Sequence, residues 1–219
     1  MKTVYFVRHG ETLFNQQKRL QGWNDSPLSP QGEQHARHVS RVIAELNLRR
    51  ALVSPLGRAR QTAEIIQQEA GIVFEVDPNL REVSFGDFEG KTLPELDIHF
   101  PGMWAARMAD KWNYCPPNGE ANKDAVPRAR SVLAKIEQLS SQDPLLIIAH
   151  FAINRIILSL LAAVAPEDTV RINVPHGVIY RARAANGHWR ISYLEAETPE
   201  RGFVDGWLWQ DDPHKPMGG

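Results

Sequence analysis

Arg8 and His9 are adjacent near the start of the chain, and together they could bind and attack a phosphoryl group. Arginine presents a rigid fork of donors that matches phosphate oxygens, and a neutral histidine carries a nitrogen that can act as a nucleophile. Gly10 follows directly and permits a sharp change of chain direction. Taken alone, so short a motif recurs by chance and favours the simpler interpretation of a strand end flanked by surface charge.

The apolar segments that precede His9 and His150 predict where these two histidines lie. Residues 3–7 are apolar, β-branched or aromatic and predict a short buried strand that ends at His9. Residues 144–149 are continuously apolar, as in a central parallel strand, and end at His150. A single histidine at such a place is more often a core residue. Two of them, each at a strand end where open α/β sheets bind ligands, favour a shared site.

The remaining segments alternate between strand and helix patterns. Further strands are predicted over residues 50–54 and 72–76, with a closing antiparallel pair over 178–182 and 188–194. Amphipathic helices are predicted over 30–47, 55–70 and 124–139, with a buried helix over 151–164. Ser29 and Ser54 each precede a proline and are typical N-cap residues.

Arg58 lies in the first turn of the helix that Ser54 would cap. The amino end of a helix favours an anion, so a guanidinium there needs a negative partner. Either a bound anion or a nearby carboxylate would supply it.

We predict a single three-layer α/β/α catalytic domain over residues 1–195, with a mostly parallel central sheet. Residues 83–122 form an inserted lid, and residues 196–219 form a partly flexible C-terminal extension with a mobile tail from Asp211. We expect the lid aromatic residues, Trp104, Trp112 and Tyr114, in the lid core. For Arg107 and Lys111, one helical turn apart, a solvated face is the default and contact with an acidic substrate the alternative.

Composition excludes several classes of partner and cofactor. The chain has 25 Lys and Arg residues against 26 Asp and Glu, without a basic stripe, so nucleic acid is not an expected partner. Its single cysteine, Cys115, excludes an internal disulfide framework. His35 and His38 have a spacing that could hold a metal, but no third ligand lies nearby in sequence, and we expect a solvated helix face. We predict no metal and no cofactor.

Residues 145–165 approach the length of a membrane span, but His150, Asn154 and Arg155 interrupt them. A buried strand followed by a buried helix explains this stretch better, so no membrane contact is expected. The first strand begins almost at once and leaves no room for a signal peptide, which predicts a cytoplasmic protein. Whether the chain forms a homodimer stays open.

The segments that could carry chemistry follow one another in a recognisable order: residues 8–12, 22–28, 54–63, 80–82 and 85–90, then His150. In this order and separation they resemble the histidine phosphatase superfamily, also called the phosphoglycerate-mutase-like family. The resemblance extends from Thr3 to about Leu194. The glycine-punctuated segment 85–90 is more similar to the phosphatase branch of that family.

The resemblance implies a role for each matching residue. His9 would be the nucleophile that takes the phosphoryl group, and Glu82 would protonate the leaving oxygen and later serve as base for water. Arg8, Arg58 and His150 would surround the phosphate oxygens and stabilise the transition state without a metal. The remaining predicted phosphate-binding residues are Asn15, Gly22 and Phe151.

Three positions depart from the family pattern. Phe151 follows the second histidine where many relatives have glycine; its N–H could still face phosphate, while its ring narrows the pocket or redirects a neighbour. His176 stands where relatives often carry a small polar residue, and we weigh a pocket residue and a loop histidine equally. Ala121 replaces a commoner serine. These departures concern the substrate more than the chemistry.

The leading interpretation is a metal-independent phosphatase that hydrolyses a small phosphorylated metabolite through phosphohistidine. A phosphoglycerate mutase would use the same phosphohistidine but must retain a bisphosphate intermediate, and the short lid lacks an obvious cluster of basic residues for it. A catalytically idle binding module of the same fold is the third alternative. The presence of all five core residues speaks against it.

Overall fold

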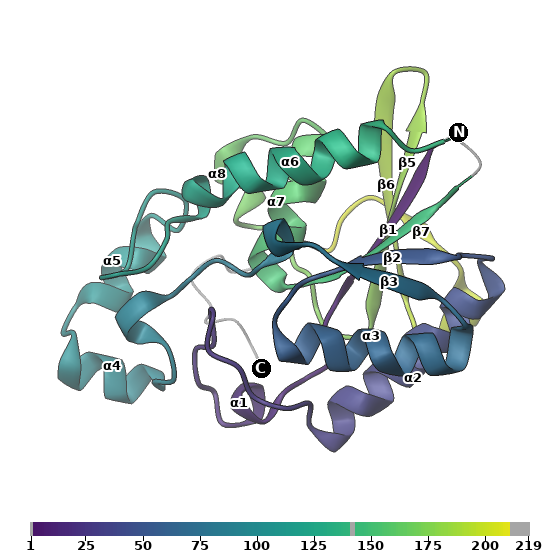
Figure 1. Ribbon diagram of the computed structural model, residues 1–219. Helices are drawn as coiled ribbons and strands as arrows, with labels where there is room; N and C mark the ends of the chain where they lie inside the picture. The colour runs from purple at the N-terminus through teal and green to yellow at the C-terminus, as the bar shows by residue number, and fades with distance from the viewer. Residues whose placement is uncertain (1, 141–142, 211–219) are drawn as a thin grey trace.

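One mixed sheet of seven strands runs through the computed structural model, which describes residues 2–140 and 143–210 (Figure 1). The strand order is β3-β2-β4-β1-β5-β6-β7, so the first strand of the chain is central. The strands are β1 (Thr3–Arg8), β2 (Arg50–Val53), β3 (Val73–Val76), β4 (Leu145–Ala149), β5 (Val178–Ala185), β6 (His188–Glu195) and β7 (Val204–Asp205).

The sheet is parallel on one side of β1 and antiparallel on the other. Strands β3, β2, β4 and β1 run parallel, whereas β5, β6 and β7 each pair antiparallel with their neighbours. The prediction of a mostly parallel sheet therefore holds only for the first four strands. Asn186 and Gly187, both with positive φ, join β5 to β6 in a tight hairpin, a connection that only antiparallel strands allow.

Helices cover both faces of the sheet, which confirms the three-layer α/β/α prediction. Helices α2 (Pro30–Glu45) and α3 (Gly57–Ala70) pack on one face, and α6 (Val126–Glu137) and α7 (Phe151–Leu161) pack on the other (Figure 1). Alternate residues of β1 enter the two cores: Val4 and Phe6 pack with α6 and α7, Tyr5 and Val7 with α2 and α3. β4 is apolar along its whole length because helices cover both of its faces.

The starts of α2 and α3 differ from each other. α2 begins as predicted, with the Ser29 hydroxyl accepting from the Gly32 N–H at 3.0 Å. α3 begins at Gly57 with Leu56 as N-cap, so the predicted cap at Ser54 is wrong. The Ser54 hydroxyl instead lies 2.6 Å from Nε2 of His150. A carboxylate from an earlier loop takes over the amino end of α3, as described below.

The lid, residues 83–122, contains α4 (Leu93–His99) and α5 (Met103–Ala109), which lie to one side of the sheet (Figure 1). A small apolar cluster of Phe85, Phe88 and Leu96 forms its centre. Trp104 and Tyr114 pack against that cluster, whereas Trp112 packs on the larger core beneath α6 and α7. The remaining short helices are α1 (Leu13–Gln16) and α8 (Pro166–Thr169).

The chain beyond β6 continues along the sheet edge. β7 pairs with β6, and the ring of Trp207 lies 6.1 Å from that of Tyr180. The predicted mobile tail, residues 211–219, lies outside the described residues. Within the described part of the chain, no helix combines the length and the apolar character needed to cross a bilayer.

Candidate active site

Strands β1 and β4 bring the two predicted histidines together. They are parallel neighbours with Arg8 opposite Ala149, and the His9 N–H donates to the Ala149 carbonyl at 3.0 Å. The residues that follow, His9 and His150, therefore leave the sheet side by side, with ring centroids 5.1 Å apart. Both histidines are buried.

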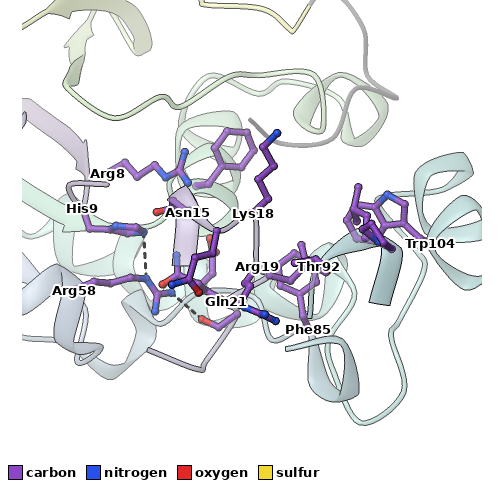
Figure 2. A pocket seen from close by; sticks show the side chains of 17 residues that line it. Arg8, His9, Asn15, Lys18, Arg19, Gln21, Arg58, Phe85, Thr92 and Trp104 are labelled. Carbon is purple, nitrogen blue, oxygen red and sulfur yellow. Dashed lines mark hydrogen bonds between the residues drawn. The ribbon is translucent and has the colours of Figure 1, made fainter. Parts of the chain in front are cut away.

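The tautomer of His9 is set by its own backbone neighbour. Nδ1 lies 2.7 Å from the carbonyl oxygen of Gly10, which can only accept, so Nδ1 carries the proton. Nε2 keeps its lone pair, and the Nε–H of Arg58 donates to it at 3.2 Å (Figure 2). Burial, followed by the nearby charge of Arg58, holds the pKa of His9 well below its usual value. His9 is therefore neutral, with Nε2 as the nitrogen able to attack.

The Arg58 guanidinium is well satisfied, because four of its five N–H groups donate hydrogen bonds within the described residues. It is 1% exposed and donates to the Asp25 carboxylate at 3.0 Å and to the carbonyl oxygens of Asn24 and Gly22 at 2.9 and 2.8 Å. Asp25 also accepts from the first N–H groups of α3, so its charge balances the guanidinium and suits the helix dipole. The structure thus supplies the expected nearby carboxylate, while Arg58 still contacts His9. Gly22, a predicted phosphate contact, uses its carbonyl to hold Arg58.

The guanidinium of Arg8, by contrast, has few hydrogen-bond partners among the described residues. Its buried guanidinium lies over the ring of Phe151, 5.2 Å from the centroid. Its hydrogen bond to the Val174 carbonyl is long, at 3.5 Å, and its Nε has no partner among the described residues. Burial lowers the pKa of Arg8 to about 10, although the charge of Glu82 opposes this. A desolvated guanidinium with unmet donors favours an anion as ligand.

Glu82 occupies the amino end of α7. Its carboxylate accepts from the Ala152 and Ile153 N–H groups at 3.1 and 3.2 Å, and from the N–H of Val83 at 2.9 Å. A helix amino end attracts negative charge, so these bonds fix the carboxylate beside the pocket that Arg8 and other predicted site residues line.

His150 and Asn15 are held by hydrogen bonds of their own. Nε2 of His150 is 2.6 Å from the Ser54 hydroxyl, and its Nδ1 has no partner in the described chain. Burial, with the charges of Arg58 and Arg8, keeps the pKa of His150 well below its usual value. Oδ1 of Asn15 accepts from the Thr12 N–H at 3.0 Å and thereby caps α1.

These residues surround a pocket of about 550 Å³ (Figure 2). Every predicted site residue except His150 lines it: Arg8, His9, Asn15, Gly22, Arg58, Glu82 and Phe151. The rest of the wall, which the sequence did not reveal, comes from the loop after α1 and from the lid: Gln17, Lys18, Arg19, Leu20, Gln21, Phe85, Thr92, Leu93, Pro94 and Trp104. No local pattern marks these residues, because their proximity depends on how the lid folds back.

Comparison with known proteins shows the family of this chain. The sequence model of the histidine phosphatase superfamily (branch 1) matches residues 4–197. This chain belongs to the histidine phosphatase superfamily. A protein of Erwinia tasmaniensis named probable phosphoglycerate mutase GpmB is 32% identical over 198 residues, which cover 90% of this chain and 92% of that protein.

Solved structures of the superfamily share the fold. YhfR of Bacillus stearothermophilus is 28% identical, with a TM-score of 0.77 over 86% of this chain and 94% of that one. A mycobacterial glucosyl-3-phosphoglycerate phosphatase has a TM-score of 0.78 at 24% identity, over 87% of this chain and 97% of that one, and so supports the fold alone.

Phe151, the departure from the superfamily's glycine, lies against two guanidiniums. Arg8 is 5.2 Å and Arg155 is 5.0 Å from the centroid of its ring. Cations are attracted to the faces of aromatic rings. Of the two effects expected of this ring, the contact with a neighbour is evident, since it supports the guanidinium of Arg8.

Arg107 and Lys111 are buried, so the expectation of a solvated face is wrong. They are 6% and 7% exposed. The Arg107 guanidinium lies over the rings of Phe85 and Trp104, 4.8 and 5.4 Å from their centroids, and burial lowers its pKa to about 10. Its Nε has no partner within the described residues. Arg107, Lys111 and Arg155 line a cavity of about 10 Å³, and Trp104 lines both this cavity and the main pocket.

His176 and His35 extend the superfamily's histidine pair into a row. The ring of His176 lies 5.3 Å from that of His9, and His35 stacks on His176 at 5.9 Å with an interplanar angle of 6°. The prediction of a solvated face is therefore wrong for His35, which also lies 3.8 Å from the Glu197 carboxylate. His38 lies 3.7 Å from the same carboxylate. Even so, the described chain contains no group of side chains that could hold a metal ion.

His176 is a neighbour of His9 that the predicted site left out. The pairing of β5 with β1 is the signal that could have placed His176 in the site, because Val7 lies opposite Ile179. Residues just before β5 must then lie beside residues just after Val7. The sequence predicted β5 but paired it only with β6, so this consequence could not be drawn.

Proposed function

We propose that this protein is a metal-independent phosphatase that hydrolyses small phosphomonoesters through a phosphohistidine on His9. The observation that carries the proposal is the neutral His9 ring, whose Nε2 lone pair lies beside Arg58 while Arg8 retains unmet donors. A phosphate group bound by both guanidiniums would present its phosphorus to Nε2, and such positioning is the main requirement of phosphoryl transfer.

In the first step, Nε2 of His9 attacks phosphorus and the bond to the leaving oxygen breaks. Glu82 would act as the general acid and donate a proton to that oxygen. The alcohol leaves, and Glu82 is ionised. The Gly10 carbonyl keeps the Nδ1 proton in place and stabilises the positive charge on the phosphorylated ring.

In the second step, water attacks the phosphorus and Glu82 accepts a proton from that water. The bond between phosphorus and Nε2 breaks, and its electron pair returns to the His9 ring. Inorganic phosphate leaves, and the protonated Glu82 is ready for the next substrate. Arg8, Arg58 and His150 would offset the charge on the phosphate oxygens in both steps.

The pocket supports hydrolysis of an organic phosphate. Its volume of about 550 Å³ lies in the range of small-molecule sites and leaves room for water beside a small metabolite. Leu20, Leu93 and Pro94 give it an apolar wall opposite the charged end, which suits an organic leaving group.

A second candidate function, phosphoglycerate mutase, gains support from the lid. The sequence argument against a mutase was the lack of an obvious cluster of basic residues in the lid, yet Arg107 and Arg155 lie buried around a small cavity that shares Trp104 with the pocket. Buried guanidiniums would help to retain a substrate with two acidic groups. We favour the phosphatase because the large pocket leaves room for water.

The phosphatase and the mutase are distinguished by measuring both inorganic phosphate and interconverted phosphoglycerate with the same enzyme. Aryl phosphate and each phosphoglycerate are supplied in excess chelator to wild type, His9→Ala and the control His99→Ala, which changes an exposed histidine of α4. We expect inorganic phosphate from wild type and control, none from His9→Ala, and little interconversion of phosphoglycerates.

Interconversion that outpaces phosphate release would establish the mutase instead. If wild type neither turned over any of these compounds nor formed an acid-labile phosphoenzyme, the proposal would fail in favour of an idle binding module.

A further inference from the structure

The peptide unit between His9 and Gly10 is held from both sides. Its N–H, from Gly10, donates to the Thr62 hydroxyl at 3.0 Å, and its carbonyl, from His9, accepts from Nδ1 of His176 at 2.6 Å. The Thr62 hydroxyl is itself fixed, because it donates to the Arg58 carbonyl at 2.8 Å. A peptide unit is planar, so two bonds on opposite edges define its tilt.

The next carbonyl, that of Gly10, starts from this tilt, and its direction also depends on the two backbone dihedrals of Gly10. That carbonyl accepts the Nδ1 proton of His9 and so decides which ring nitrogen is free to attack. Gly10 adds no restraint of its own, because a glycine backbone is permissive. A side chain is also barred there, since a Cβ on Gly10 would lie 2.2 Å from the Gly32 carbonyl oxygen. The hydrogen bonds to Thr62 and His176 restrain the turn before Gly10, and the bond from the Ser29 N–H to the Glu11 carbonyl at 2.9 Å restrains it beyond.

We propose that His176 is a positioning residue for the nucleophile. Its Nδ1–H holds the His9 carbonyl, fixes the tilt of the His9–Gly10 peptide and thereby keeps the His9 ring in its Nδ1–H tautomer with Nε2 directed at phosphate. The inference rests on the proposed role of His9 as nucleophile.

The surroundings of His176 suit this role. A carbonyl can only accept, so the proton of His176 must sit on Nδ1, and its enclosed Nε2 has no partner among the described residues. Burial, followed by the charge of Arg8, holds the pKa of His176 well below its usual value and keeps the ring neutral. His35 stacks on the outer face of the ring and is itself placed by Gln31, 3.3 Å from its Nε2.

The test compares His176→Asn with His176→Leu. Asparagine offers a side-chain N–H close to the position of Nδ1, whereas leucine fills similar space without a donor. His188→Leu, an exposed histidine on β6, is the matched control. Two readouts are taken. Steady-state turnover of aryl phosphate gives kcat and KM, and ¹⁵N NMR without substrate gives the tautomer of His9.

We expect His176→Leu to lower kcat by about 30-fold with KM changed less than about threefold, because misplacement of a reacting group acts on the chemical step. His9 should then exchange between tautomers. His176→Asn and His188→Leu should keep kcat within about threefold of wild type and a single Nδ1–H tautomer. Wild-type His176 should itself show the Nδ1–H tautomer.

A leucine variant with wild-type kcat and an unchanged His9 tautomer would overturn the inference, as would an Nε2–H tautomer of His176 in the wild type. If wild type formed no phosphoenzyme at all, the proposed function would fail. The NMR comparison would still decide whether His176 sets the His9 tautomer, and an Nε2–H tautomer of wild-type His176 would overturn the inference even if the leucine variant does not fold.

Discussion

The two ends of the pocket are built by different physical means. At the phosphate end, directional hydrogen bonds fix the reacting groups: the Gly10 carbonyl holds His9, Asp25 holds Arg58, and the amino end of α7 holds Glu82. At the lid end, the Arg107 guanidinium lies over the rings of Phe85 and Trp104.

This difference separates chemistry from substrate selection. Hydrogen bonds to strand ends and helix ends allow one geometry, as transition-state stabilisation requires. Aromatic and guanidinium contacts tolerate several arrangements, as recognition of a varied leaving group requires. We therefore expect changes at the phosphate end to affect every substrate and changes at the lid end to affect some.

Acid should destabilise the fold through the phosphate end, and this is the largest expected effect. His9, His150 and His176 all have pKa values well below the usual 6.5, with burial as the main cause. Each takes up a proton on unfolding, so the free energy of unfolding should fall below pH 6.5 by about 1.4 kcal/mol per pH unit for each histidine.

Urea denaturation at a series of pH values measures this loss. The decline should continue until the pH reaches the lowered native pKa values. A free energy of unfolding that stayed constant between pH 7 and pH 5 would contradict buried, neutral histidines at this end.

Arg8→Met should lower kcat/KM by about 10²–10³ for every phosphomonoester, because it removes a donor aimed at the transferring phosphate. The fold should survive, since the Arg8 guanidinium has few hydrogen bonds to lose. Steady-state kinetics on aryl and aliphatic phosphates provide the measurement, with Arg41→Met, at an exposed position of α2, as control. A loss confined to one substrate would assign Arg8 to selection rather than chemistry.

Asp25→Ala should act mainly on stability. It removes the cap of α3 and leaves the buried guanidinium of Arg58 without its counter-charge. Because Asp25 is 33% exposed, we expect about 2 kcal/mol of lost stability, less than for a fully buried pair. Chemical denaturation compares it with Asp168→Ala, whose exposed pair with Arg171 should contribute less than about 0.5 kcal/mol. Equal losses would show that Asp25 does not hold Arg58.

Arg107→Met should have the smallest effect and the most selective one. We expect KM to rise by about tenfold for phosphomonoesters that carry a second acidic group, and to stay unchanged for aryl phosphate. Paired KM measurements on an aryl phosphate and a phosphoglycerate test this. An equal change for both substrates would place Arg107 with the phosphate end and remove the distinction.

The pairing of His9 with His150 could be predicted because its cause is local, whereas the roles of residues such as Glu82 came from the family resemblance. The apolar runs before His9 and His150 specify buried parallel strands, and strands of this kind deliver their next residues to one edge of the sheet. The three-layer fold follows from the same runs and from the amphipathic helices between them. The start of α3 was missed because its cap comes from Asp25, in a distant loop.

The lid end and the outer histidines depend on contacts between distant segments. Arg107 has the local pattern of a solvated residue, and only the packing of Phe85 and Trp104 buries it. His176 reaches the nucleophile because β5 pairs with β1, which no short motif specifies. Positions whose surroundings come from long-range packing thus remained unassigned, whereas positions at strand ends did not.

The central claim is that Nε2 of His9 carries the phosphoryl group. Rapid acid-free quenching during turnover, followed by ³¹P and ¹⁵N NMR of the trapped phosphoenzyme, tests it most directly. The account predicts one acid-labile, base-stable phosphoryl group bonded to Nε2 of His9, and none in His9→Ala. Phosphate release without a phosphoenzyme, or a phosphoryl group on Nδ1 or on another residue, would contradict it.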